Sequence, residues 1–168
     1  MISNMVSPIF VTSVKTKKNE DAVGLSLTQL GELRGKDPYE ATFDLLLEEE
    51  NAVGMVDFYG KEEHVKLFMK RPEMNACTDG LLGGKPHPRV FGAFPRILGK
   101  YVREENTFSL EDAIYKMTKK PATTFNIVNR GELREGNFAD ITIFNPETVI
   151  DKGTYTDPVQ YPEGIEYV

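Results

Sequence analysis

The chain contains very little cysteine, histidine and tryptophan: its 168 residues include one Cys, two His and no Trp. The single Cys77 excludes an internal disulfide framework and is typical of a reducing compartment, so we expect a cytoplasmic protein. His64 and His87 lie too far apart in sequence to form an HxH or HExxH metal motif. No apolar run approaches the roughly 18 residues that cross a membrane, and residues 1–5 lack the pattern of a secretory signal.

Basic residues are also in the minority, with 20 Lys and Arg against 26 Asp and Glu and a net charge of −6. Because a nucleic-acid-binding surface needs a basic stripe, we expect no nucleic-acid partner. Ten Phe and seven Tyr offer enough apolar surface for a folded core. The length suggests one domain and excludes a complete (β/α)8 barrel, which needs roughly 250 residues.

Segments typical of strands and of helices alternate along the first half of the chain. Ser26 with Gln29 forms a capping-box pattern, and Asp37 precedes a proline at the first helical position. The expected strands are 8–14, 52–58 and 73–78, and the expected helices are 26–33, 37–50 and 61–69. This alternation is typical of an α/β fold with parallel strands.

The second half begins with an irregular loop over 81–94, and Pro95 predicts the start of a helix. Ser109 predicts the N-cap of a further helix whose apolar face carries Ala113. The expected elements are a helix over 95–102, a helix over 109–117, a helical turn over 121–125 and short strands with turns over 130–168.

The same patterns predict whether individual side chains are buried or exposed. In the helix 61–69, the inner face is expected to carry Val65, Phe68 and Met69, with His64 exposed on the polar face. Cys77 is expected inside a strand, as a small apolar residue.

Two charged stretches are interpreted as solvated surface. Residues 15–18 are basic and follow a strand, so we expect a solvated turn, with a phosphate-binding patch as the alternative. Residues 48–50 are three consecutive glutamates at a helix end. They point in different directions on a helix, which favours a solvated end over a metal site.

The candidate site comprises Asp79, His87 and Arg89. Asp79 follows an expected strand, where α/β folds place their chemistry, and its carboxylate suits a general base or a metal ligand. The forked donors of Arg89 suit the binding of a carboxylate. The alternative interpretation is structural: Asp-Gly is a common turn dipeptide, and Pro-His-Pro makes a rigid loop.

Several motifs together resemble one family, the N-acyl-D-amino-acid deacylases (D-aminoacylases) of the metal-dependent amidohydrolase superfamily. The stretches that carry the resemblance are Cys77–Gly80, Lys85–Arg89, Gly92–Gly99, Leu110–Thr118 and Glu135–Phe144. The string Asp-Gly, His-Pro-Arg, Phe-Pro-Arg is specific to the D-aminoacylase branch. The Ala139-Asp140 motif within Glu135–Phe144 is less specific, because it recurs across the superfamily. The resemblance implies the last part of a (β/α)8 TIM-like barrel over 1–128 and part of a small β-sandwich over 129–168.

The resemblance also implies a reaction, the hydrolysis of the amide bond of N-acyl-D-amino acids. In such enzymes a zinc ion activates a water molecule, and the aspartate that matches Asp79 takes its proton and passes it to the leaving amine. The arginine that matches Arg89 holds the substrate carboxylate, and a substrate-binding role is assigned to His87 beside it. The HxH metal ligands of the family are absent from this sequence.

We therefore expect the C-terminal third of such an enzyme, inactive alone and binding no metal by itself. The alternative is a non-catalytic or split-gene subunit that completes a barrel with another chain, or that self-associates through unpaired strand edges. A third interpretation is a small independent α/β binding domain. The expected ligand is a small N-acyl-D-amino acid, with no nucleic-acid or membrane partner.

Overall fold

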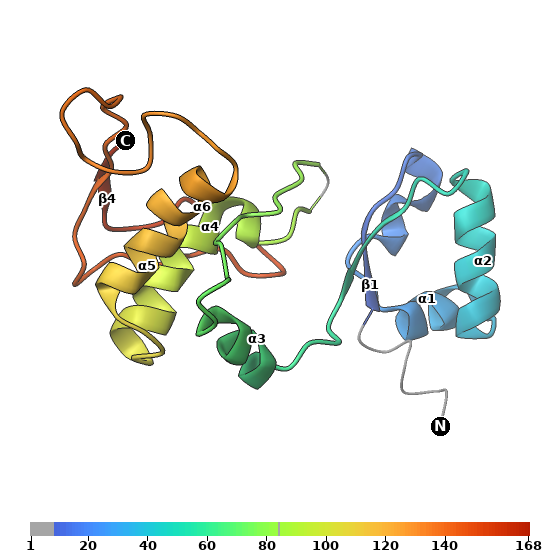
Figure 1. Ribbon diagram of the computed structural model, residues 1–168. Helices are drawn as coiled ribbons and strands as arrows, with labels where there is room; N and C mark the ends of the chain where they lie inside the picture. Colours follow the sequence, from blue (N-terminus) through green and yellow to red (C-terminus); the bar gives the residue numbers. More distant parts are fainter. Residues whose placement is uncertain (1–8, 84) are drawn as a thin grey trace. The chain divides into compact units, whose positions relative to one another are not determined.

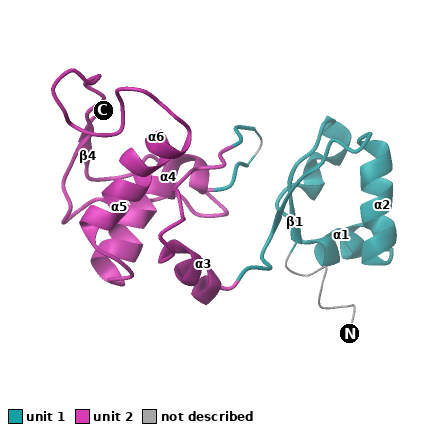
Figure 2. Ribbon diagram, in the orientation of Figure 1, with its two compact units in different colours: residues 1–60, 81–87 teal, residues 61–80, 88–168 magenta. Residues whose placement is uncertain are grey.

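The computed structural model describes residues 9–83 and 85–168 (Figure 1). The chain divides into two compact units (Figure 2): unit 1 comprises Met1–Gly60 and Leu81–His87, and unit 2 comprises Lys61–Gly80 and Pro88–Val168. The prediction about a secretory signal in residues 1–5 lies outside the described residues. Across residues 9–83 and 85–168, no helix is both long and apolar enough to cross a membrane.

Unit 1 contains a two-stranded sheet of β1 (Ile9–Ser13) and β2 (Gly54–Asp57). The strands are antiparallel, with Phe10 opposite Val56, so the prediction of parallel strands is wrong for this pair. The segment between the strands returns the chain in the opposite direction, which an alternating pattern does not specify. A Cβ atom at Gly54 would lie 2.4 Å from Ser13 Oγ and 2.8 Å from Thr12 Oγ1, so a larger residue would displace these hydroxyl groups.

Three helical segments connect these strands: η1 (Lys17–Ala22, a 3₁₀-helix), α1 (Leu27–Arg34) and α2 (Pro38–Glu48). The Ser26 hydroxyl accepts from Gln29 N at 3.2 Å, and the Gln29 side chain accepts from Ser26 N at 2.9 Å, which confirms the capping box. Asp37 accepts from Tyr39 N at 2.9 Å and caps α2, as predicted. The core of unit 1 consists of Val11, Ala22, Leu30, Ala41 and Leu45.

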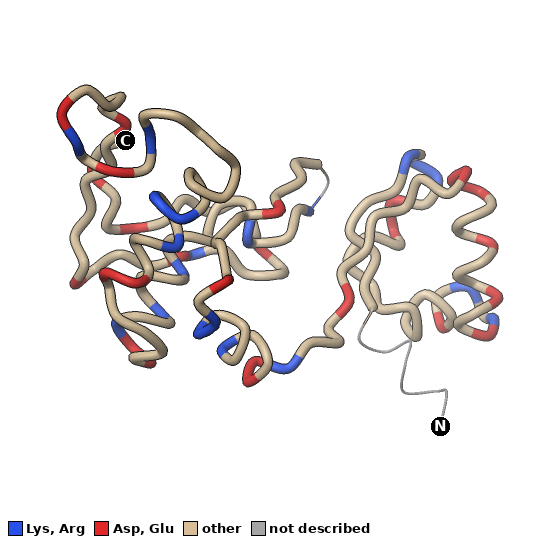
Figure 3. The backbone as a smooth tube through the Cα atoms, in the orientation of Figure 1, with Lys and Arg blue, Asp and Glu red and all other residues tan. Residues whose placement is uncertain are grey.

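The basic turn and the acidic helix end lie close together at one end of unit 1 (Figure 3), and their side chains form ion pairs. Lys15 forms an ion pair with Glu50, and Lys18 Nζ lies 3.4 Å from Glu48 Oε2. Glu49 is completely buried, so the prediction of a solvated end is wrong for this residue. Its carboxylate satisfies backbone N–H groups of the turn, a long-range contact that no local pattern encodes.

Unit 2 is mainly helical, with two short strands near the C-terminus. Its elements are α3 (Glu62–Met69), α4 (Arg89–Arg96), η2 (Ile97–Glu104, a π-helix), α5 (Leu110–Met117), α6 (Lys119–Thr124), β3 (Ile143–Phe144) and β4 (Ile165–Tyr167). The helix predicted from Pro95 instead begins at Arg89 and contains Pro95, so residues 89–94 are not loop. Ser109 accepts from Asp112 N at 3.1 Å and caps α5, as predicted.

The core of unit 2 gathers around α5 and η2. Its buried members are Met69, Ala76, Ile97, Leu98, Tyr101, Ala113 and Val149. The predicted inner face of α3 is confirmed for Met69 and wrong for Val65 and Phe68, which are 40% and 68% exposed. His64 is exposed, as predicted. Of the three residues predicted for the inner face of α3, Met69 alone is buried, so the apolar period of the sequence overestimates its buried face.

Residues 73–78 form no strand, contrary to prediction. The Ala76 N–H donates to Lys116 O at 3.0 Å, so this segment bonds to the end of α5 rather than to a sheet. Cys77 is exposed and not buried as expected. The C-terminal region has the predicted short strands: β3 and β4 are antiparallel, and Ile150 bridges to Glu163.

Candidate functional site

The structure brings Asp79 and Arg89 together through two contacts within unit 2. Arg89 Nη2 lies 2.7 Å from Asp79 Oδ2, and Arg89 Nε donates to the backbone carbonyl of Asp79 at 2.9 Å. The arginine is the first residue of α4, so its side chain extends back toward the turn that carries Asp79. Two of the three sequence-predicted site residues are therefore neighbours.

The turn at Asp79 has an unusual backbone. Asp79 has a φ of +44°, in the left-handed region that Asp and Asn tolerate better than most residues. The next N–H, of Gly80, donates to Thr78 Oγ1 at 3.3 Å. A Cβ atom at Gly80 would lie 3.2 Å from Val90 Cα, so glycine lets the turn approach α4 closely. This local chemistry holds the Asp79 carbonyl and carboxylate near Arg89.

Both charged groups reach solvent. The side chain of Asp79 is 74% exposed and that of Arg89 is 41% exposed. A small molecule in solution can therefore reach both side chains.

His87 belongs to unit 1, whereas Asp79 and Arg89 belong to unit 2. The structure therefore brings together the aspartate and the arginine, and the role of His87 stays a prediction.

Asp151 was missed by the sequence analysis although it fixes α4. Its carboxylate, 8% exposed, accepts from Arg96 Nη1 at 2.9 Å, and a Cβ at Gly92 would lie 2.7 Å from its Cβ. Burial lowers the pKa of Arg96, but the hydrogen bond and charge of Asp151 outweigh it, so the pKa is raised. The Phe-Pro-Arg motif indicated Arg96, but no local signal indicated Asp151.

A second polar cluster joins α3 to η2. Glu62 accepts from Tyr101 Oη at 2.8 Å and from Lys100 Nζ. Burial and the Glu62 carboxylate raise the pKa of Tyr101 to about 12, and the hydrogen bond from Lys100 lowers the pKa of Glu62. These groups satisfy each other's hydrogen bonds, so the cluster has a structural role and links α3 to η2.

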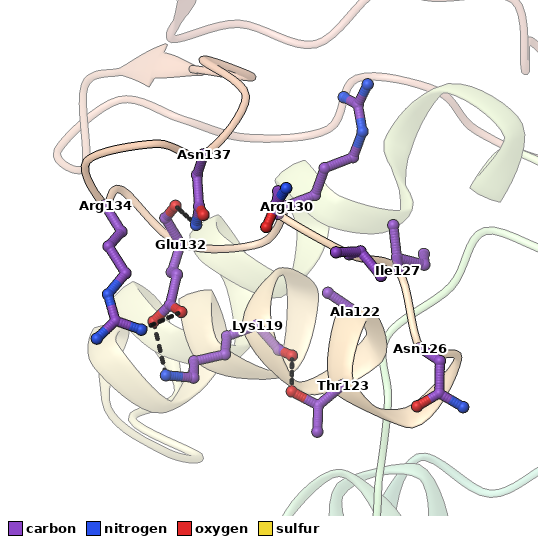
Figure 4. Close-up of a pocket in the computed structure, with 11 residues that line it drawn as sticks. Lys119, Ala122, Thr123, Asn126, Ile127, Arg130, Glu132, Arg134 and Asn137 are labelled. Carbon is purple, nitrogen blue, oxygen red and sulfur yellow. Dashed lines mark hydrogen bonds and ion pairs between the residues drawn. The ribbon is translucent and has the colours of Figure 1, made fainter.

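A separate open pocket of 320 Å³ lies between α6 and the segment that follows it (Figure 4). Glu132 accepts from Lys119 Nζ at 2.6 Å and lies 3.9 Å from Arg134 Nη1. Arg130 pairs with Asp140 and stacks on Phe138. The charged groups of this pocket form ion pairs, Lys119 and Arg134 with Glu132 and Arg130 with Asp140, and Asp79 and Arg89 do not line the pocket.

The zinc centre that the resemblance implies requires a cluster of metal-binding side chains. Within residues 9–83 and 85–168, no group of three or more His, Cys, Asp or Glu side chains could hold a metal ion. The residues present do not fit the zinc centre that the family resemblance implies.

Three comparisons with known proteins agree. The model of the Amidohydrolase family matches residues 31–168. A D-aminoacylase of Alcaligenes xylosoxydans xylosoxydans is 36% identical over 146 residues, which cover 86% of this chain and 29% of that protein. An N-acyl-D-glutamate deacylase of the same organism is 39% identical over 116 residues, which cover 68% of this chain and 24% of that protein.

A solved structure also resembles the chain. The crystal structure of N-acyl-D-glutamate deacylase from Bordetella bronchiseptica, complexed with zinc and a phosphonate inhibitor, has a TM-score of 0.89 and 32% sequence identity. The match covers 97% of this chain and 33% of that protein.

The mixed α/β fold and the match over residues 31–168 show that the chain belongs to the amidohydrolase family. Its relatives include a D-aminoacylase and two N-acyl-D-amino-acid deacylases, hydrolases that act on amide bonds. The chain spans about a third or less of their length.

Proposed function

We propose that this chain is the C-terminal portion of a metal-dependent amidohydrolase that cleaves N-acyl-D-amino acids. The observation that carries the proposal is the pairing of Asp79 with Arg89 inside the stretch that matches the family. Residues 1–128 would be the last strands and helices of a (β/α)8 barrel, and residues 129–168 would be part of its β-sandwich. Zinc would be bound by other residues of the complete enzyme.

The proposed roles follow from the chemistry of the two side chains. Asp79 takes one proton from the attacking water as its oxygen bonds to the amide carbon. The same proton then passes to the amine nitrogen as the C–N bond breaks, which leaves a carboxylate and a D-amino acid. Arg89 binds the α-carboxylate of the substrate through its forked donors, and His87 contributes to the same subsite.

A chimera tests this function. Residues 9–168 would replace the matching C-terminal part of the Alcaligenes D-aminoacylase, and hydrolysis of N-acetyl-D-amino acids would be measured with zinc present. We expect turnover that Asp79→Ala abolishes, and a raised KM with Arg89→Met. Asp140→Asn, at another exposed Asp–Arg pair, is the matched control. A folded chimera that hydrolyses no N-acyl-D-amino acid would contradict the proposal.

The isolated chain provides the complementary test. Because its described residues hold no metal cluster, we expect no turnover when zinc and N-acetyl-D-amino acids are added to the chain alone. Substantial hydrolysis by the isolated chain would overturn the proposed dependence on other residues.

A second candidate function is association with a chain that supplies the remaining barrel strands. The observation that favours it is α2, which is apolar on two sides: Ala41 and Leu45 are buried, whereas Phe43 and Leu47 are 68% and 81% exposed. An outward apolar face of this kind is typical of a contact surface. Light scattering after size exclusion, with and without a complementary barrel portion, is expected to show a complex. A monomer in both samples contradicts this candidate.

A further inference from the structure

We propose that Arg89 exchanges one carboxylate for another: it holds Asp79 in the ligand-free chain and the α-carboxylate of an N-acyl-D-amino acid in the complex. Ligand binding then releases the Asp79 carboxylate for proton transfer. This inference rests on the proposed function, because it takes Asp79 as the proton acceptor and Arg89 as the carboxylate-binding group.

The two contacts between these residues differ in kind. Arg89 Nε donates to the backbone carbonyl of Asp79 at 2.9 Å, and a backbone carbonyl has no freedom to leave. Arg89 Nη2 contacts the side-chain Oδ2 at 2.7 Å, and a side chain rotates away without moving the turn. The backbone contact therefore keeps the guanidinium oriented while the second contact changes partner. A guanidinium oriented in advance loses less freedom when it binds a ligand.

Because Asp79 and Arg89 are exposed to solvent, breaking their ion pair requires little free energy. With side chains 74% and 41% exposed, Asp79 and Arg89 form a solvated ion pair. Such pairs are weak, so competition from Asp79 reduces the affinity for a ligand carboxylate by only about two- to fivefold.

Arg96, in the same helix as Arg89, forms an ion pair with Asp151 that provides the contrast. Asp151 is 8% exposed and lies against Gly92, so it has no room to move away from Arg96. A carboxylate ligand has no comparable way to replace Asp151. The exchange is therefore specific to the N-terminal end of α4.

The exchange has a consequence for specificity. A ligand with an α-carboxylate both binds Arg89 and frees Asp79, whereas a neutral N-acyl amide leaves the ion pair intact. Recognition of the carboxylate and availability of the proton acceptor are thereby coupled through one guanidinium group.

Nuclear magnetic resonance of the full chain tests the exchange directly. The probes are the ¹³Cγ signal of Asp79 and the ¹⁵Nε signal of Arg89, and the ligands are N-acetyl-D-alanine and N-acetyl-D-alaninamide. We expect both signals to move with the same midpoint on addition of the carboxylate ligand, and neither to move with the amide. A response of Arg89 without Asp79, or no response of either at saturating ligand concentration, overturns the proposal.

Two substitutions distinguish the exchange at Arg89 from a general effect of removing one negative charge. Asp79→Asn keeps a residue that tolerates the left-handed backbone, and we expect it to bind N-acetyl-D-alanine about two- to fivefold more tightly than the unmodified chain. Asp140→Asn removes an equal charge from another exposed Asp–Arg pair and is expected to leave the affinity unchanged. Equal effects of the two substitutions overturn the proposal.

Failure of this inference is distinguishable from failure of the proposed function. If the chimera hydrolyses N-acetyl-D-amino acids but the ¹³Cγ signal of Asp79 does not move on addition of the ligand, the exchange alone is contradicted. Coupled movement of the two signals with an inactive chimera contradicts the hydrolase and leaves a carboxylate-binding site.

Discussion

Glu49 accepts two hydrogen bonds from Thr16, one from its backbone N–H at 2.7 Å and one from its hydroxyl. Further donors are the Lys15 N–H at 2.6 Å and Asn19 Nδ2 at 2.6 Å. The hydrogen bond from the Thr16 hydroxyl, with those from Asn19 and the backbone, outweighs burial and lowers the pKa of Glu49 to about 2. A buried carboxylate thus joins the end of α2 to the turn after β1.

The stability of unit 1 should therefore depend on pH through Glu49. The ordinary pKa of 4.5 lies above the folded value of about 2, so between these values the unfolded chain binds a proton that the folded chain does not. The contribution of Glu49 is complete above about pH 4.5 and is lost as the pH falls toward 2. Urea unfolding followed by the amide signals of Leu30 and Leu45 measures this dependence.

The control for this prediction is the same substitution at the neighbouring residue. Glu49→Gln is expected to lower stability at neutral pH, because the amide places a donor against donors, and to remove its part of the pH dependence. Glu50→Gln, at an exposed glutamate, is expected to keep the original profile. Parallel profiles for the original chain and Glu49→Gln would contradict this account.

Lys116 is a buried ammonium whose removal should destabilise unit 2. It is 7% exposed, and its Nζ donates to the carbonyls of Met69 and Arg71 at the end of α3. Burial lowers its pKa. Lys116→Met leaves both carbonyls without this donor and is expected to cost about 1–3 kcal/mol in urea unfolding. Lys70→Met, on the exposed surface, should stay within about 0.5 kcal/mol of the original chain.

Gly99 leaves no space for a side chain between η2 and the C-terminal segment. A Cβ there would lie 2.5 Å from Val149 O and 2.6 Å from Ile150 Cδ1. Gly99→Ala is expected to lower the melting temperature and to cost about 1–3 kcal/mol through overpacking. Gly60→Ala introduces the same methyl group where no atom lies within 4 Å. An equal melting temperature for the two variants would contradict the prediction.

The Arg96–Asp151 pair should be energetically coupled, because one partner is largely buried. A double-mutant cycle with Arg96→Met and Asp151→Asn is expected to give a coupling free energy of about 1 kcal/mol or more. The reference cycle uses Lys61 and Glu63, whose charged atoms are 3.9 Å apart and well exposed. Coupling there should be close to zero. No difference between the cycles would mean that the Asp151 contact does not fix α4.

Local features of this fold were predictable from the sequence, and long-range ones were not. The caps at Ser26, Asp37 and Ser109 depend on residues two or three positions away, and all three are confirmed. The direction of β2 against β1 depends on the path of the chain between them. The burial of Glu49 depends on Thr16, which lies in another part of the sequence.

The candidate site shows the same division. The motif indicated Asp79 and Arg89, but the bond from Nε to the Asp79 carbonyl needs the left-handed turn and the helix start at Arg89. That start was missed because Pro95 is typical of a first turn, whereas here it lies inside α4. Asp151 has no sequence signal, because its partner Arg96 lies far away along the chain.

The π-helix η2 has a consequence for how this region tolerates changes in length. It continues α4 without a break, so Arg89 and Glu104 lie at opposite ends of one helical rod. The Glu105 N–H donates to Lys100 O at 2.9 Å, the wider spacing of a π turn. Such a turn holds one residue more than an α turn. Deleting one residue here would let the turn close as an α turn, so the residues beyond it would keep their orientation relative to Arg89, whereas a deletion in a regular α-helix rotates them by about 100°. The π segment therefore absorbs a one-residue deletion without a change in the angular phase between the two ends of the rod.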